Sequence, residues 1–412
     1  MKHSSHHRPI YETPPLSGDD RAVLGEIHQM RKELRHVLRT PKRWEGGLRR
    51  SALARAIRGS NSIEGYQVAE DDAAAALDDE GPIGADERTF LEIQGYRFAL
   101  GYVLARGEDD YSGFDATEIR AMHYMMLRHD PAKSPGRYRK GPVFVHDERS
   151  DRVVYEGPEA AEVPALVEAL VESLRSGSDV DPVVRSAMAH LNLVMIHPFR
   201  DGNGRMARAL ATSVLTRSDI GEPEFSSIEE WLGANTEDYY AALALTGRGS
   251  WRPSGDARLW ISFSLRAHHM QAQTVAQRVQ QAGETWAELD DLIARHALPE
   301  RAIDAMFEAV LGYRIRRAGY LKRTGVEDQT ATRDLAALAG PGILVPHGTG
   351  RGRYYTAGEP LQRIQDSRRA GRKPLTDPYP WMRPRLAEPP GDAPTAPGGD
   401  GGPRRGGRGS PG

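Results

Sequence analysis

HPFRDGNGRMAR, residues His197 to Arg208, is the stretch from which the fold and the chemistry of this chain can be argued. His197 can carry a proton near neutral pH. Asp201 is a hard oxygen ligand of the kind that Mg²⁺ accepts beside phosphates. The two residues are four positions apart, so their side chains can lie in one loop. The stretch therefore predicts a general base beside a metal ligand.

The second half of the same stretch favours the binding of an anion. Gly202, Asn203 and Gly204 have small side chains, which let backbone N–H groups approach an anion at the start of a helix, where the helix dipole favours negative charge. Arg205 and Arg208 are three residues apart, so they lie on one helix face and could each bind a phosphate. The simpler reading is a buried histidine that caps a helix, with two arginines on a solvated face.

The flanking residues predict that the loop joins two helices. Asp181 and Pro182 suit an N-cap and a first helical position, and the apolar residues after them recur at helical spacing until Pro198 stops the helix. The second helix begins at the end of the loop. Its inward-facing apolar residues are Met206, Leu210 and Val214.

The stretch resembles the full signature of the Fic family, which has the histidine, the phenylalanine, the acidic residue, Gly-Asn-Gly and both arginines at this spacing. The resemblance implies transfer of a nucleotide monophosphate, usually AMP from ATP, onto a hydroxyl of a target protein or of the enzyme itself. ATP would be the substrate and Mg²⁺ the cofactor. The fold class implied is mainly α, a Fic-type helical bundle with a β-hairpin flap.

The resemblance also gives each residue of the loop a role. His197 would take the proton from the target hydroxyl, Asp201 would hold Mg²⁺, and Phe199 would anchor the loop in the core. The remaining residues would bind the phosphates of ATP: Asn203 and the amides near Gly202 and Gly204 the α- and β-phosphates, Arg205 and Arg208 the β- and γ-phosphates.

A second informative stretch is SNSIEG, residues 60 to 65. By itself it is an ordinary helix end with a glycine stop. Beside the loop it resembles the inhibitory motif of Fic proteins, matched here by Ser60, Glu64 and Gly65. That motif implies that Glu64 pairs with Arg208, so that this arginine cannot also receive a γ-phosphate and ATP binds in an unproductive pose. Some relatives also use this glutamate to remove AMP, so deAMPylation is a further expectation.

A β-hairpin is predicted upstream of the loop. Val143, Phe144 and Val145 form one short strand, residues 153–155 form another, and a charged run makes the turn. A free-edged hairpin can pair with an extended peptide through main-chain hydrogen bonds. In the Fic family the hairpin at this place aligns the target hydroxyl; the alternative is that it only covers an edge of the core.

The last part of the chain resembles a winged helix-turn-helix, with helices near 315–321 and 328–339 and a hairpin around 348–353. Such a module could place a helix in a DNA groove and wing arginines on phosphates. The alternative is protein docking or support of a homodimer. The residues that would contact DNA are Gln329, Thr330, Arg333, Arg351 and Arg353.

Composition limits the other classes. The length of 412 residues suggests two or three domains. The 55 basic and 57 acidic residues nearly balance, so the net charge does not indicate a particular kind of partner. Cysteine is absent, and we find no apolar run long enough to cross a membrane and no signal-like segment, so we expect a soluble, cytoplasmic protein. The boundaries predicted are 1–18 (disordered), 19–110 (helical region with the inhibitory helix at about 47–65), 111–250 (catalytic core), 251–298 (helical connector), 299–357 (winged helix-turn-helix) and 366–412 (disordered tail rich in proline, glycine and arginine).

The function expected is therefore a protein adenylyltransferase that modifies an unknown target protein and itself, and is inhibited by Glu64. Two alternatives of other kinds stay open. One is a DNA-binding regulator with a largely silent Fic core, and the other is a Fic transferase with a different donor, which would transfer UMP, phosphate or phosphocholine.

Overall fold

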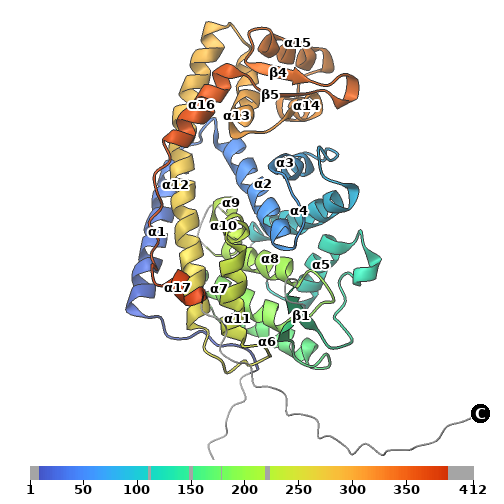
Figure 1. The fold of residues 1–412 in the computed structure, drawn as a ribbon, viewed down its shortest axis with the longest axis vertical. Helices are drawn as coiled ribbons and strands as arrows, with labels where there is room; N and C mark the ends of the chain where they lie inside the picture. Colours follow the sequence, from blue (N-terminus) through green and yellow to red (C-terminus); the bar gives the residue numbers. More distant parts are fainter. Residues whose placement is uncertain (1–8, 110–112, 148–151, 178, 219–222, 388–412) are drawn as a thin grey trace, which may run out of the picture.

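The computed structural model describes residues 9–109, 113–147, 152–177, 179–218 and 223–387, and it is mainly helical (Figure 1). No helix among these residues is long and apolar enough to cross a membrane. The helices up to Arg295 are α1 (Gly18–Leu38), α2 (Glu45–Ile63), α3 (Glu70–Leu77), α4 (Glu87–Gly107), α5 (Ala116–Leu127), α6 (Val163–Ser176), α7 (Pro182–Ile196), α8 (Asn203–Thr216), α9 (Pro223–Ser226), α10 (Glu229–Ala234), α11 (Thr236–Gly247) and α12 (Arg258–Arg295).

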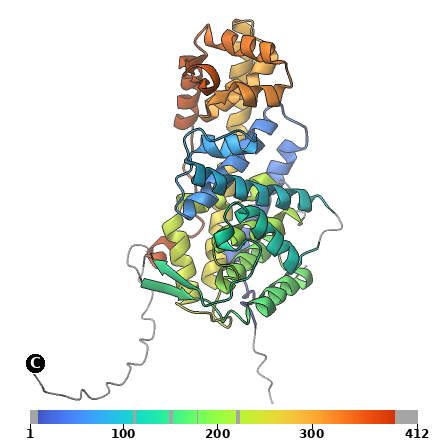
Figure 2. The same cartoon turned by 90° about the vertical axis from the view of Figure 1, so that its right-hand side faces the viewer.

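The strands form two small antiparallel sheets. One is the hairpin of β1 (Phe144–Asp147) and β2 (Arg152–Glu156), which projects from the side of the helical body in Figure 2. Val143 was expected in the first strand, but the strand begins one residue later. The other sheet has the order β3-β5-β4 and belongs to the C-terminal part of the chain. Its strands are β3 (Ile315–Arg316), β4 (Leu344–His347) and β5 (Tyr354–Ala357).

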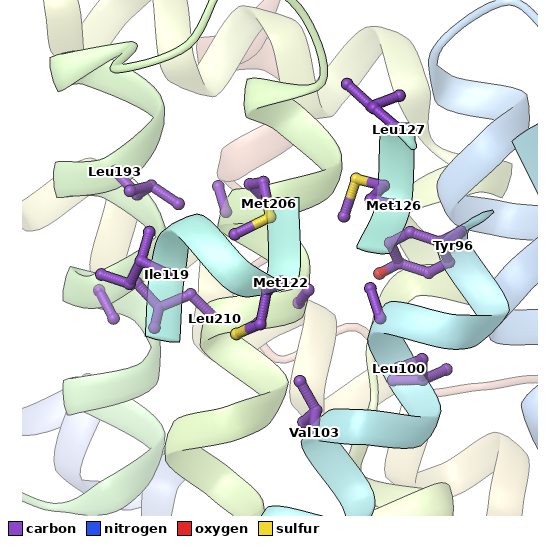
Figure 3. Close-up of a cluster of buried hydrophobic side chains, with 14 of the residues drawn as sticks. Tyr96, Leu100, Val103, Ile119, Met122, Met126, Leu127, Leu193, Met206 and Leu210 are labelled. Atoms are coloured by element: carbon purple, nitrogen blue, oxygen red, sulfur yellow. The ribbon is translucent and has the colours of Figure 1, made fainter. Parts of the chain in front are cut away.

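The core of the helical body fixes the helices on both sides of the loop. Side chains of α4, α5, α7 and α8 meet in one buried cluster (Figure 3). Leu193 of α7 and Met206 and Leu210 of α8 lie in it, so the two helices are held against each other just beyond the loop that joins them. Burial of each such side chain contributes about 1.5–3 kcal/mol to folding. The loop is therefore carried on a rigid base.

The helix α12 is the longest helix among the described residues. It runs for 38 residues to Arg295, within the predicted helical connector at 251–298, and connects the body to the C-terminal part (Figure 1). The second half of the helix keeps a buried stripe at helical spacing, which explains its length. That stripe consists of Val275, Val279, Ala282, Trp286, Leu289 and Leu292.

The N-terminal segment is ordered where disorder was predicted. Residues 1–8 lie outside the described residues, but Ile10 and Tyr11 are buried. The backbone N–H of Tyr11 donates to Oδ1 of Asn192 at 2.8 Å, and Nδ2 of Asn192 donates to the carbonyl of Tyr11 at 3.0 Å. A capping box of Ser17 and Asp20 then starts α1. Two apolar anchors and a cap thus order a segment whose composition is otherwise polar.

The prediction of a disordered tail from residue 366 is also wrong for its first part. After α16 (Glu359–Ala370) the chain returns along α12 and ends in α17 (Met382–Leu386) beside the helical body (Figure 1). Tyr379 is buried, and its hydroxyl donates to Oδ1 of Asp20 at 2.8 Å. Asp377 accepts two charge-assisted bonds from the buried guanidinium of Arg266, at 3.0 and 2.6 Å. The rest of the predicted tail, 388–412, lies outside the described residues.

Residues 303–357 follow the order of elements that was predicted for a winged helix-turn-helix. Gly325, with φ of 66°, makes the turn between two of the helices, and the assignment as a winged helix stays a prediction. The helices are α13 (Ile303–Leu311), α14 (Arg317–Thr324) and α15 (Asp328–Ala339).

The cationic side chains of β3 and α14 contact acceptor groups of the chain itself. These acceptors lie at the end of α3 and in the loop that follows it. Arg323 pairs with Asp78 at 2.8 Å. Lys322 pairs with Asp79 at 3.1 Å, and Arg316 donates to two carbonyls of the loop that follows. Positive charge that a DNA backbone would need is thus neutralised within the chain itself.

The residues predicted to contact DNA differ in their exposure and in their contacts. Gln329 and Arg333 are exposed on α15, and Thr330 is half-buried there. The guanidinium of Arg353 lies over the ring of Tyr355, 5.4 Å from its centroid. The side chain of Arg351 lies outside the described part of the structure.

The helix α2 packs against the C-terminal part of the chain at one end and against α10 at the other. At its N-terminal half, Nη1 of Arg50 lies 3.1 Å from Oε1 of Glu308, and the hydroxyl of Tyr313 donates to Ser51 at 3.0 Å; both partners belong to the C-terminal part. Toward its other end it crosses α10 so closely that a Cβ atom at Gly59 would lie 2.3 Å from the carbonyl oxygen of Glu229. The helix that ends in Glu64 therefore has little freedom to shift.

We expect Gly59→Ala to destabilise the protein by about 1–3 kcal/mol, because the added methyl group must push two packed backbones apart. Urea denaturation would measure the loss. Gly46→Ala is the matched control, since Gly46 lies in the same helix with no atom within 4 Å of its added Cβ. We expect the control to be neutral or to stabilise by about 0.5–1 kcal/mol, as alanine does in a helix. Equal stability of both variants would contradict the close crossing.

Candidate active site

His197 ends α7 in a left-handed conformation, with φ of 51° and ψ of 57°. Its Nδ1 lies 3.0 Å from the carbonyl oxygen of Val194. A carbonyl can only accept, so Nδ1 carries the proton of the neutral ring and Nε2 holds the lone pair. Burial lowers the pKa of the imidazole below its ordinary value of 6.5. His197 is therefore a neutral ring whose Nε2 is ready to take a proton.

Phe199 anchors the loop in the core, and Asn203 closes it. The ring of Phe199 is buried and stacks on His123, with centroids 3.8 Å apart. Oδ1 of Asn203 accepts from the backbone N–H of Phe199, and its Nδ2 donates to the carbonyl of the same residue, both at 2.9 Å. The predicted anchor is thus where it was expected. The side-chain amide of Asn203 holds the loop together, and its contact with a phosphate stays a prediction.

Asp201 is a partly accessible acid of the loop. Its carboxylate is 41% exposed and lies 2.8 Å from Nζ of Lys133. Burial would raise the pKa of the Asp201 carboxyl, but the bond and the charge of Lys133 outweigh burial and hold that pKa below its ordinary value. Its backbone carbonyl lies 3.0 Å from Nε2 of His123. Asp201 is therefore an ionised carboxylate fixed beside the start of α8.

Arg205 is buried and paired with Glu92 of α4. Nη1 of Arg205 lies 2.5 Å from Oε2 of Glu92, and the guanidinium lies over the ring of Tyr66, 5.6 Å from its centroid. Glu92 also contacts Lys133 at 2.6 Å and accepts from the hydroxyl of Tyr66 at 2.9 Å. One acid thus joins both cations next to the loop, so Arg205 reaches the site as part of a fixed network.

Arg208 is held by the stretch that resembles the inhibitory motif. Its Nε donates to Oγ of Ser60 at 2.8 Å, and its Nη2 donates to the carbonyl of Ser60 at 2.9 Å and to Oε1 of Glu64 at 2.6 Å. Gly65, with φ of 84°, lets the chain turn away directly after Glu64. The pairing of Glu64 with Arg208 is the contact that the resemblance implied.

The carboxylate of Glu64 also lies against the start of α8. A Cβ atom at Gly204 would lie 2.5 Å from Oε1 of Glu64. Gly202 is the N-cap of this helix with φ of 75°, so backbone N–H groups of the first turn are presented to an anion at this place. Glu64 thus occupies the position at which a phosphate group would meet both Arg208 and the helix N-terminus.

The hairpin stands next to His197. Phe144 pairs with Glu156 and Val145 with Tyr155 across its two strands. The hydroxyl of Tyr155 donates to the carbonyl of Met195 at 2.7 Å, which ties the second strand to the end of α7. Phe144 and its neighbours leave apolar surface in solvent: 45% of Phe144 is exposed.

Several residues at the site were missed in the sequence, namely Glu92, His123, Lys133 and Arg139. Each lies more than 50 positions before the loop, so no local spacing connects it to the motif. Glu92 alone gives a local signal, because it falls on the apolar stripe of α4 between Thr89 and Tyr96. A carboxylate on a buried stripe needs a cationic partner.

The described residues contain no group of three or more histidines or carboxylates that could hold a metal ion by themselves. Mg²⁺ is usually bound through one or two carboxylates together with substrate phosphates and water. The half-exposed carboxylate of Asp201 beside the N-terminus of α8 fits a single protein ligand of that kind.

The comparisons with known proteins agree with this geometry. Residues 113–215 match the model of the Fic/DOC family. Protein adenylyltransferase fic-1 of Caenorhabditis elegans is 30% identical over 256 residues, which cover 58% of this chain and 45% of that protein. Protein adenylyltransferase Fic of Nematostella vectensis is 28% identical over 204 residues, which cover 47% of this chain and 43% of that protein. The chain thus spans less than half the length of these curated relatives.

Solved structures resemble the chain over a larger part of its length. A Fic family protein from Desulfovibrio desulfuricans G20 aligns with a TM-score of 0.54 and 22% identity over 85% of this chain and 99% of that one, which shows the shared fold. A fragment of Fic-1 from Caenorhabditis elegans aligns with a TM-score of 0.50 and 25% identity over 64% of this chain and 72% of that one.

Proposed function

We propose that this chain is a Fic/DOC-family protein adenylyltransferase, which transfers AMP from ATP to a hydroxyl of a target protein or of itself. The observation that carries the proposal is the state of His197. Its ring is neutral, is oriented through Nδ1, and presents the lone pair of Nε2 beside a helix N-terminus that suits phosphates.

The reaction follows from these positions. Nε2 of His197 takes the proton of a serine, threonine or tyrosine hydroxyl as its oxygen attacks the α-phosphorus of ATP. The bond from that phosphorus to the bridging oxygen breaks, and pyrophosphate leaves. The backbone N–H groups near Gly202 and Gly204, together with Arg205 and Arg208, stabilise the charge that develops on the phosphates. Asp201 would hold Mg²⁺, which supplies further positive charge to those phosphates.

Glu64 restrains this reaction. Arg208 cannot bind the γ-phosphate while its Nη2 is bound to Glu64, and the carboxylate stands where an anion would enter at Gly204. The triphosphate is then held in a pose unsuited to in-line attack. The same carboxylate could orient a water molecule for removal of AMP, so deAMPylation belongs to the proposal as a second activity of the same site.

The test uses purified protein with α-labelled ATP and Mg²⁺, alone and with a cell lysate as a source of targets. Label retained on protein in the Glu64→Gly variant, with an added mass equal to one AMP, is the expected result. If the donors of UMP, phosphate or phosphocholine are supplied and the added mass matches one of these groups, the enzyme transfers that group and not AMP. Label on no protein in any variant would reject transfer, and binding of duplex DNA would then be measured.

The lowered pKa of His197 predicts the pH dependence of transfer. Because the neutral ring is the base, a pKa below 6.5 keeps it active at lower pH. In Glu64→Gly, we expect kcat at saturating ATP to be flat from about pH 8 to 6.5 and to fall only below that range. The affinity for ATP, measured over the same pH range, shows whether a fall in rate comes from protonation of ATP or from protonation of the enzyme. An acid limb centred above pH 6.5 would contradict the prediction.

A further inference from the structure

Arg139 lies just before the hairpin, and its surroundings are unusual for an arginine. It is 8% exposed, and burial lowers the pKa of its guanidinium. Among the described residues it forms no ion pair with a carboxylate. Its guanidinium instead donates to backbone carbonyls: Nε to His197 at 2.8 Å, Nη1 to Gly141 at 2.8 Å and Nη2 to Pro158 at 2.5 Å.

The three carbonyls belong to three different places in the chain. Gly141 precedes β1 and Pro158 follows β2, so they mark the two ends of the hairpin, while His197 begins the loop. Nη2 also lies 3.5 Å from the carbonyl oxygen of Ile196, and the backbone N–H of Arg139 donates to the carbonyl of Pro198 at 2.9 Å. Since the guanidinium is planar and its N–H groups point in fixed directions, these bonds set where the hairpin stands relative to the histidine.

The base of the hairpin packs closely against the guanidinium. A Cβ atom at Gly157 would lie 2.6 Å from Cγ1 of Val143, 3.4 Å from Nη2 of Arg139 and 3.8 Å from Cβ of His197. The base of the hairpin, the guanidinium and the histidine are thus in direct contact. The carbonyl of His197 belongs to a left-handed residue, and Arg139 supplies its partner there.

We propose that Arg139 is a positioning residue, which holds the hairpin in register with Nε2 of His197 so that a hydroxyl on a peptide bound along the hairpin meets the base. The inference rests on the proposed transferase function. It assigns to Arg139 no contact with ATP, because its donors are used by the hairpin and the loop, whereas the triphosphate would lie at the start of α8.

The experiment compares Arg139→Met and Arg139→Lys in the Glu64→Gly background. A displacement of about 1 Å in a reacting group can cost about 100-fold in rate, so we expect Arg139→Met to lower kcat for AMP transfer to protein by about that factor, with the affinity for ATP changed less than about twofold. Arg139→Lys keeps the charge and one donor direction, so we expect partial recovery.

Arg175→Met is the matched control, since Nε of Arg175 also donates to a backbone carbonyl, that of Phe114, at 2.7 Å, away from the loop. We expect it to leave transfer unchanged. Thermal unfolding of each variant shows whether the fold persists. Transfer that is unchanged in Arg139→Met, or that falls in parallel with ATP affinity and stability, would overturn the inference.

A second measurement is independent of activity. Hydrogen exchange of the hairpin amides and the NMR signals of the His197 ring report the same contacts without ATP. We expect faster exchange in β1 and β2 and a changed ring signal in Arg139→Lys, and neither change in Arg175→Met. If the Glu64→Gly parent transfers nothing, the proposed function fails, and this measurement still decides the role of Arg139: unaltered exchange and ring signals would refute it.

Discussion

Glu64→Gly is expected to raise the rate of AMP transfer by about 10- to 100-fold, because a charge-assisted hydrogen bond of about 1.5–3 kcal/mol no longer competes with the γ-phosphate for Arg208. The bond removed is the one of 2.6 Å between Oε1 of Glu64 and Nη2 of Arg208. The measurement is label incorporated per enzyme from α-labelled ATP in single-turnover conditions.

Two further variants show whether charge or bulk restrains the enzyme. Glu64→Gln keeps the size of the side chain and removes its charge, so we expect a smaller rise than in Glu64→Gly. Ser60→Ala removes the hydroxyl that accepts from Nε of Arg208 and keeps the carboxylate, so we expect wild-type restraint. Equal labelling of wild type and Glu64→Gly would show that the ion pair is structural and does not inhibit.

His197→Ala, introduced into Glu64→Gly, is expected to lower transfer by about 10²- to 10⁴-fold, the contribution of a well-placed general base. The affinity for ATP should change little, because the phosphates would be bound by α8 and its arginines. Single-turnover labelling and nucleotide binding measure the two quantities separately.

His28→Ala is a suitable control for that loss. His28 is exposed and lies 2.6 Å from Asp181, at the far end of α7 from the loop. We expect its removal to leave transfer at the parent rate. A His197→Ala variant that keeps more than about a tenth of the parent rate would remove the base from the mechanism.

The helices around the loop could be predicted because their signals are local. Asp181 and Pro182 begin α7, and the turn at Gly202 begins α8, where the sequence placed both. The pairing of Glu64 with Arg208 was predicted for a different reason: it was implied by the resemblance, since 144 positions separate the two residues. Spacing within the chain could not have connected them.

The contacts that orient the site could not be predicted in this way. Lys133 and Arg139 lie in a polar loop where cations are ordinary, and only the fold brings them to Asp201 and His197. The same limit explains the errors at the two ends of the chain. The composition of both segments is mostly polar, but a few buried side chains, among them Tyr11 and Tyr379, hold each segment against the helical body.

The DNA hypothesis shows the reverse problem. The residues of β3 and α14 include several lysines and arginines, which could bind the phosphates of a DNA backbone. The sequence does not reveal that Asp78 and Asp79, more than 200 positions earlier, accept those cations. The cations of α14 are therefore paired within the chain, whereas Arg333 on α15 is exposed.

The position of α2 has a practical consequence for anyone who dissects this chain. Trp44 and Leu48, near the start of the helix, pack with Phe307 of α13 in one apolar cluster. A fragment that stops after α12 would leave these side chains in water and would remove the partners of Arg50 and Ser51. Rates measured on such a fragment would describe a protein whose helix α2 is held at one end only, so the protein should be assayed with residues 299–387 in place.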